Sequence, residues 1–204
     1  MTVDEHVSIA ALPLPLRWLA EPQSWSSPDA ASLTLTAGPR TDRFADPQLA
    51  AGPVLNAPAL VAEPSGDFRL SARVTVDFAA TYDAGVLILH ASDRAWAKLC
   101  FEYSPQREPM VVSVVTRDVS DDCNSFVVDG ASVWLRIVRT GRAFAFHASA
   151  DGVKWTFIRH FALDADDSPA VGFAAQSPTG DGCVVMFEQI AYEAAGLHDL
   201  RSGE

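Results

Sequence analysis

The stretch DFRLSARVTVDF, residues 67–78, alternates apolar and polar side chains without interruption. Successive side chains of a β-strand point to opposite faces, so a period of two is typical of a strand with one buried and one solvated face. We therefore predict a strand here, lying against a hydrophobic core. Its apolar face contains Phe68, Leu70, Ala72, Val74, Val76 and Phe78.

Eight more segments carry a similar strand pattern, and they occupy most of the chain after residue 84. The links between them contain turn residues such as Asp151 and Gly152, which favour a tight hairpin. No convincing helical period occurs between residues 60 and 193. Short strands at this regular spacing predict an all-β fold, an antiparallel two-sheet β-sandwich or jelly roll. The eight segments are 85–91, 96–103, 110–117, 131–139, 143–149, 154–161, 170–176 and 183–193.

We predict a single domain over residues 1–193, followed by a tail, residues 194–204, that frays or forms a short helix. The Pro- and Ala-rich stretch from Pro47 to Pro64 resembles a linker, but it lies too early in the chain to separate two cores. A length of 204 residues is ordinary for one all-β domain.

Charge and hydropathy argue against several classes of partner. A formal net charge of -11 repels the phosphates of nucleic acid. No segment has the apolar length that a transmembrane helix needs. The N-terminal stretch MTVDEHVSIAALPLPL begins with acids rather than bases and its apolar run is broken by prolines, unlike a secretory signal. We therefore expect a cytoplasmic protein with no nucleic-acid or membrane partner.

The three cysteines are odd in number and have no CxxC spacing, which favours reduced structural thiols over a disulfide. Cys100 and Cys183 lie inside strand patterns and are expected to be buried. Cys123 stands in a polar stretch and is expected to be exposed.

Several strings occur in order along the chain, among them RWLAEPQSW (17–25), TDRF (41–44), YDAGVLI (82–88), WAKLCFEY (96–103), VWLRIVRTG (133–141) and SPTGDGCVVMFEQI (177–190). Together they resemble the regulation-of-enolase family, a domain of unknown function, over about residues 14–193. The resemblance implies a concanavalin A-like lectin/glucanase fold and, through the family's name, a protein partner that is a metabolic enzyme. Two positions depart from the family. Cys100 replaces a small residue, and Asp122 stands where an aromatic residue is frequent.

Several strand faces carry polar residues although their other members are too apolar for a solvated surface, namely His90, Lys98, Glu102, Arg136 and Gln176. We expect these faces to form one partly enclosed concave surface. The indoles of Trp96 and Trp134 would lie against the apolar side of a sugar while charged groups bond its hydroxyls. The predicted function is a non-catalytic module that binds a carbohydrate or sugar-like ligand. The structural alternative is a buried Glu102–Arg136 ion pair, with both indoles serving as packing.

Catalysis is the second hypothesis. A retaining glucanase of this fold places two carboxylates on one strand face, commonly as Glu-x-Asp-x-x-Glu, and no such string occurs. Glu102 is the only acid on a candidate central strand, so a hydrolase, lyase or epimerase that uses Glu102 is kept as an alternative. The chain has no GxSxG, HExxH or phosphate-binding glycine motif, and no cofactor is expected.

The polar stretch TRDVSDDCNS, residues 116–125, follows a predicted strand and is expected to be a loop at the rim of the groove. Arg117, Asp118 and Asp121 would reach into the mouth of the groove. Asp118, Asp121, Asp122 and Asn124 offer oxygen ligands for calcium, but the stretch lacks the glycine and distal glutamate of a calcium loop. The acidic run at 164–167 has the same defect, so no metal site is predicted.

Overall fold

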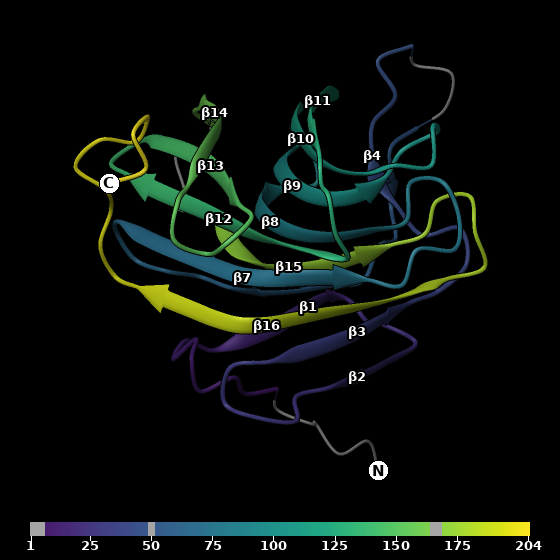
Figure 1. Ribbon diagram of the computed structural model, residues 1–204, viewed down its shortest axis with the longest axis horizontal. Coiled ribbons are helices and arrows are strands. Elements are labelled where there is room, and N and C mark those ends of the chain that lie inside the picture. Colours follow the sequence, from purple (N-terminus) through teal and green to yellow (C-terminus); the bar gives the residue numbers. More distant parts are fainter. Residues whose placement is uncertain (1–6, 49–51, 164–168) are drawn as a thin grey trace.

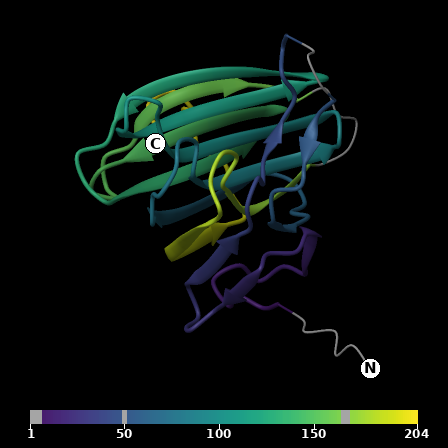
Figure 2. The ribbon, with the colours of Figure 1, turned by 90° about the vertical axis from the view of Figure 1, so that its right-hand side faces the viewer.

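The computed structural model describes residues 7–48, 52–163 and 169–204. Two antiparallel sheets face each other across a hydrophobic core (Figures 1 and 2). Sheet 1 is formed, in spatial order, by β1 (Leu16–Ala20), β6 (Ala59–Ala62), β15 (Ala170–Gln176), β8 (Ala84–Ser92), β9 (Ala95–Tyr103), β10 (Pro109–Arg117) and β11 (Val119–Val127). Sheet 2 is formed by β14 (Thr156–Phe161), β13 (Ala143–Ser149), β12 (Ser132–Thr140), β7 (Phe68–Val76), β16 (Cys183–Glu193), β3 (Leu33–Ala37) and β2 (Ser24–Ser26). A short ladder joins β4 (Arg43–Phe44) to β5 (Val54–Leu55).

The predicted antiparallel sandwich is confirmed, and each of the nine predicted strands occurs with its ends shifted by at most a few residues. In β7 the burial of side chains alternates strictly, as the sequence of this stretch predicts. The part of the chain that the structure describes contains no helix long and apolar enough to cross a membrane. Cys100 and Cys183 are buried and Cys123 is exposed, which confirms the three predicted environments.

The core between the sheets is built from the apolar faces of these strands. Burial of a Leu, Val or Phe side chain contributes about 1.5–3 kcal/mol, so these alternating faces are the main source of stability. Fully buried members from sheet 1 include Leu87, Leu99, Phe101 and Phe173, and those from sheet 2 include Leu70, Val74, Leu135, Phe146 and Phe187.

The Pro- and Ala-rich stretch from Pro47 to Pro64, which resembles a linker in sequence, contains the strand β6 inside sheet 1. β6 lies between β1 and β15 in sheet 1, and all four of its residues are buried. Because both of its faces are covered, the strand has no polar face and therefore no period of two. Gly172 of β15 pairs with Val61 here, and a Cβ at Gly172 would lie 2.0 Å from the carbonyl oxygen of Leu60.

The predicted rim loop at 116–125 is wrong, because most of it is the edge strand β11. The chain reverses at Asp118, which has a φ of 63° and donates its backbone N–H to the carbonyl of Arg94 at 2.8 Å. β11 then pairs with β10 along its length. Most side chains on both faces of β11 are exposed. The strand therefore has no alternation of apolar and polar residues from which it could be predicted.

The C-terminal tail, residues 194–204, folds against the outer face of sheet 2 rather than fraying (Figure 1). Nε2 of His147 lies 2.8 Å from the carbonyl oxygen of Leu200, and Nη2 of Arg136 donates to the carbonyl of Gly203 at 2.8 Å. Leu197 is buried. The tail therefore covers side chains of β12 and β13 that would otherwise face solvent.

Candidate functional site

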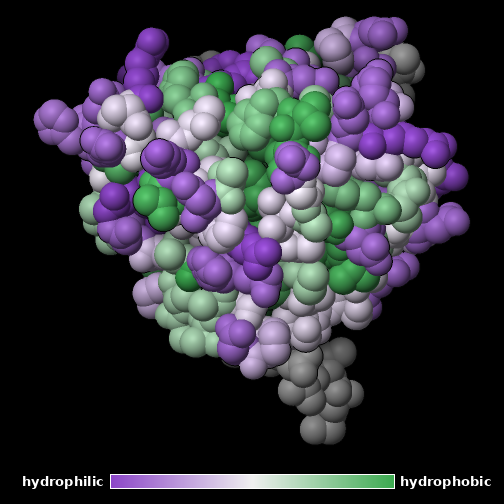
Figure 3. Space-filling view, in the orientation of Figure 1, coloured by the Kyte–Doolittle hydropathy of each residue, from purple (hydrophilic) through white to green (hydrophobic). Residues whose placement is uncertain are grey.

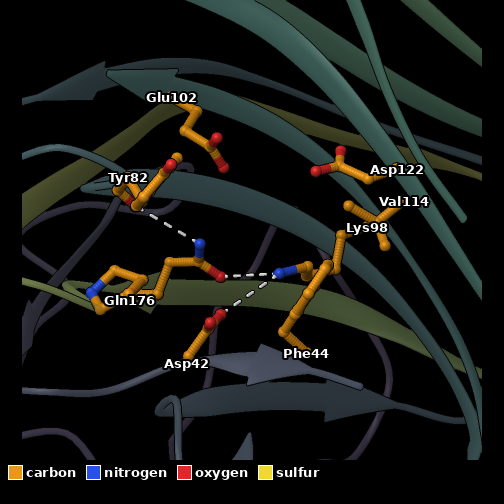
Figure 4. Close-up of a pocket in the computed structure, with 9 residues that line it drawn as sticks. Asp42, Phe44, Tyr82, Lys98, Glu102, Val114, Asp122 and Gln176 are labelled. Carbon is orange, nitrogen blue, oxygen red and sulfur yellow. Dashed lines mark hydrogen bonds and ion pairs between the residues drawn. The ribbon is translucent and has the colours of Figure 1, made fainter. Parts of the chain in front are cut away.

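A cavity of about 260 Å³ opens on the outer face of sheet 1, the face turned away from the core. The other side of the molecule, seen in Figure 3, mixes hydrophilic and hydrophobic side chains over its whole surface. Charged, amide and aromatic groups come together in the cavity (Figure 4). Its lining consists of Asp42, Phe44, Tyr82, Lys98, Glu102, Val114, Asp122, Gln176 and Pro178.

Strand register brings the polar groups of the cavity together. One cross-strand row places Gln176 of β15 level with Glu102 of β9. A second row places Lys98 of β9 level with Asp122 of β11. The row between them is apolar and contains Val86, Cys100 and Val112. The side chains of both polar rows therefore project from the same face of sheet 1.

Lys98 holds the base of the cavity in place. Its Nζ donates to Oε1 of Gln176 at 2.9 Å and lies 3.5 Å from Oδ1 of Asp42. Gln176 in turn donates from Nε2 to the carbonyl of Tyr82 at 3.4 Å. Lys98 and Gln176 are both buried, so these partners compensate for the lost hydration of the ammonium and amide groups.

Glu102 is the most strongly perturbed acid of the site. Glu102 is partly exposed, and its side chain lines the cavity. Loss of hydration raises the pKa of Glu102 to about 8; Lys98 opposes this change, whereas Asp122 and Asp42 add to it. Burial also raises the pKa of Asp122, against the influence of Lys98. Glu102 is thus protonated at neutral pH and can both donate and accept hydrogen bonds.

A buried aspartate positions the turn that carries Tyr82. Oδ2 of Asp83 accepts hydrogen bonds from the backbone N–H groups of Ala79 and Ala80 at 2.9 and 2.7 Å. Its Oδ1 accepts one from the hydroxyl of Ser177 at 2.6 Å. Tyr82 has a φ of 70°, is 40% exposed, and is one of the residues that line the cavity. Asp83 thereby joins this turn to the residue that follows Gln176.

The remaining wall comes from the segment around β4. The backbone N–H of Ala45 donates to the hydroxyl of Ser120 at 3.0 Å, and that of Ser120 donates to the carbonyl of Ala45 at 2.8 Å. These bonds hold Asp42 and Phe44 over sheet 1. Neither residue is predicted from the sequence, because the two-residue strand β4 is too short to show a period and Asp42 lies just before it.

Of the predicted site residues, Lys98, Glu102 and Gln176 meet in the cavity, whereas His90 and Trp96 lie on the same face but outside it. Trp96 is fully buried beneath Arg43, whose guanidinium carbon is 5.6 Å from the indole centre. The expectation of an open indole at this position is therefore wrong. Burial, followed by the charge of Arg43, lowers the pKa of His90 to about 4.

The expectation that Glu102, Trp134 and Arg136 share one face is wrong. β9 belongs to sheet 1 and β12 to sheet 2, and the two side chains that were expected to pair point outward from opposite sides of the sandwich. Arg136 stacks on Trp155, with its guanidinium carbon 4.1 Å from the ring centre. Nε1 of Trp134 donates to Oε1 of Gln189 at 3.2 Å.

The predicted rim residues Arg117, Asp118 and Asp121 do not line the cavity. Arg117 donates to the carbonyl of Ala162, Asp118 accepts from Arg94, and Asp121 forms an ion pair of 3.0 Å with Arg159. Asp122 faces the cavity instead. In the described residues no three His, Cys, Asp or Glu side chains converge on a metal position, and the run at 164–167 lies outside those residues.

Replacing Arg136 with lysine is expected to lower the free energy of unfolding by about 1–2 kcal/mol. Lysine cannot both stack on Trp155 and reach the carbonyl of Gly203, because it lacks the planar fork of arginine. Urea unfolding would measure the loss, and Arg142→Lys at an exposed turn is the matched control. Equal stability of the two variants would contradict the structural role of Arg136.

The fold and site define an all-β antiparallel sandwich with a small acidic cavity on the outer face of one sheet. The chain belongs to the family described as "Protein of unknown function (DUF1349)", whose profile matches residues 18–195. The comparison with curated protein sequences found no match.

Several solved structures share the fold. A functionally unknown protein from Saccharomyces cerevisiae is 25% identical, with a TM-score of 0.80 over 89% of this chain and 97% of that one. The GH43 protein BlXynB mutant (K247S) from Bacillus licheniformis is 15% identical, with a TM-score of 0.69 over 87% of this chain but only 36% of that one. The alginate lyase from Klebsiella pneumoniae is 13% identical, with a TM-score of 0.54 over 83% of each chain. The last two likenesses concern the fold alone.

Proposed function

We propose that this domain binds a small carbohydrate or sugar-like ligand in the cavity over sheet 1. The observation that carries the proposal is the composition of the cavity, in which carboxyl, amide and ammonium groups stand beside the rings of Phe44 and Tyr82. Sugar rings have hydroxyls at their edges and apolar C–H groups on their faces, so they need both kinds of partner. The ligand site stands on sheet 1 alone and does not include Arg136 or Trp134.

The size of the cavity limits the ligand. Pockets for drug-sized ligands commonly measure about 300–1,000 Å³, and the cavity of about 260 Å³ lies just below that range. It therefore suits one sugar ring rather than a chain of several. The occurrence of the fold in a GH43 protein and an alginate lyase agrees with a sugar-related role at the level of fold only.

Replacing Tyr82 with alanine is expected to weaken the binding of a monosaccharide about tenfold or more, because the ring offers its exposed face to the ligand. Isothermal titration with a panel of neutral monosaccharides would identify the ligand and measure the loss. Met186→Ala is the matched control, because Met186 has the same exposed fraction of 40% but lies on sheet 2. Binding that is unchanged in Tyr82→Ala, or lost equally in both variants, would overturn the assignment to this cavity.

A reaction at a sugar is the second candidate, and the meeting of Glu102 with Asp122 favours it. The sequence shows Glu102 as a lone acid on its strand, but the structure adds a second carboxyl from β11. Glycosidases commonly use one protonated and one ionised carboxyl. Release of product from aryl glycosides, abolished in Glu102→Gln, would favour this function over simple binding.

The resemblance to the regulation-of-enolase family suggests a third role, in which the domain binds a metabolic enzyme in the cytoplasm. That role is independent of the cavity. In this role the domain would bind the metabolic enzyme equally well with or without the substitution Tyr82→Ala.

A further inference from the structure

Two carboxyl groups of the cavity, those of Glu102 and Asp122, feel the charge of Lys98 but form no close ion pair in the described residues. Lys98 is already engaged by Asp42 and Gln176. In the part of the chain that the structure describes, no side chain forms an ion pair with Glu102 or Asp122, and no group donates a hydrogen bond to the carboxyl of Glu102. Asp122 is exposed and Glu102 is partly exposed, so in the free protein water is the partner that a ligand carrying hydrogen-bond donors would replace.

The two carboxyl groups face a common space. In Figure 4 the side chain of Glu102, from β9, and that of Asp122, from β11, extend toward each other across the cavity. The charge of Asp122 contributes to the raised pKa of Glu102, as expected for a neighbouring acid. Lys98 lies below this space and is directed toward Asp42 and Gln176 (Figure 4).

Aromatic rings complete this environment. Phe44 and Tyr82 both line the cavity. The negative face of an aromatic ring attracts a cation, most strongly where water is excluded. Two carboxyls without a close ion pair, beside two aromatic rings, therefore suit an organic ammonium group better than they suit a carboxylate or phosphate.

We propose that the ligand of this cavity carries a protonated amine, which lies between the carboxyl groups of Glu102 and Asp122. The inference rests on the proposed function and narrows its ligand class from carbohydrates in general to amino sugars. An ammonium donates up to three charge-assisted hydrogen bonds, which are about twice as strong as those from a neutral hydroxyl. The negative charge of Asp122 disfavours acidic sugars.

The proposal predicts that binding releases a proton. In the empty cavity Glu102 is protonated, because loss of hydration and the charges of Asp122 and Asp42 outweigh the effect of Lys98 on its own strand. An arriving ammonium favours the ionised carboxylate, so the proton leaves to buffer. A neutral sugar leaves Glu102 protonated and releases none.

The test is isothermal titration of D-glucosamine, D-glucose, N-acetyl-D-glucosamine and D-glucuronate at pH 6.5 in two buffers of different ionisation enthalpy. D-Glucosamine is expected to bind about tenfold or more tightly than D-glucose, and the acetylated and acidic sugars more weakly than D-glucosamine. Only D-glucosamine should give a heat that depends on the buffer. Glu102→Gln, shown first by its melting temperature to be folded, should remove both the preference and the proton release. Glu108→Gln, in the exposed turn after β9, should keep them.

The outcomes separate this inference from the function on which it rests. If D-glucose binds as tightly as D-glucosamine, the amine site is overturned while carbohydrate binding stands. If cyclohexylamine binds in a Glu102-dependent manner but no sugar does, the amine site stands and the carbohydrate assignment fails. If neither the sugars nor cyclohexylamine bind, both are overturned.

Discussion

Replacing Glu102 with glutamine is expected to stabilise the protein at alkaline pH, by up to about 4 kcal/mol near pH 9. The pKa of Glu102 rises from 4.5 to about 8 on folding, chiefly through loss of hydration. Between these values the native state holds a proton that the unfolded state has released, so the free energy of unfolding falls as pH rises, by up to about 1.4 kcal/mol per pH unit. Glutamine cannot ionise, and its shape is close to that of the protonated acid.

Urea unfolding of both proteins at pH 6.5 and pH 9 would measure this effect. Lower pH is avoided because burial lowers the pKa values of His90 and His147 to about 4, so each histidine destabilises the fold as pH falls from 6.5. Glu108→Gln removes an exposed carboxylate and should leave the pH profile of the wild type unchanged. Parallel profiles for the wild type and Glu102→Gln would show that Glu102 is hydrated in the native state.

Replacing Asp83 with alanine is expected to cost about 3–5 kcal/mol of stability. The carboxylate is fully buried and accepts from two backbone N–H groups and the hydroxyl of Ser177. Its removal leaves the buried hydroxyl of Ser177 and two partly buried N–H groups without their acceptor, and an unsatisfied buried group costs about 1–3 kcal/mol. The loss also frees the turn that carries Tyr82, so ligand binding should weaken in the fraction that remains folded.

Chemical denaturation would measure the loss, with Asp77→Ala as the control. Asp77 is an exposed aspartate just after β7, and its removal should change the free energy of unfolding by less than about 0.5 kcal/mol. Asp83→Asn keeps one acceptor and is expected to fall between the two. A loss of less than about 1 kcal/mol in the free energy of unfolding of Asp83→Ala would mean that water replaces the carboxylate and that the turn is stable without Asp83.

Asp122 is the carboxyl that faces Glu102 across the cavity. An aromatic residue at this position would remove the paired charge. The variant Asp122→Phe therefore distinguishes two kinds of ligand binding in the cavity. Ammonium binding should be weakened by it, whereas binding through stacking on aromatic rings should be kept.

Sequence alone determined the strands that lie with one face in the core. In β7, β9 and β12 the period of two survives because one face is packed and the other is polar or mixed. It also determined the burial of Cys100 and Cys183, since both stand within such runs. Where the asymmetry between faces is absent the pattern disappears: β6 is covered on both faces, and β11 is polar on nearly all of both.

The composition of the site was decided only by the tertiary structure. Alternation indicates that Glu102 and Arg136 each leave the core face of a strand, but it does not indicate to which sheet the strand belongs, so two residues with the same local pattern lie on opposite sides of the molecule. Asp42 and Asp122 reach Glu102 through the packing of the β4 segment on Ser120 and through the register of β10 with β11. The first depends on a contact between segments far apart in sequence. The second depends on the turn at Asp118 that sets the β10–β11 register, and the polar sequence of β11 carries no alternation that would indicate this register.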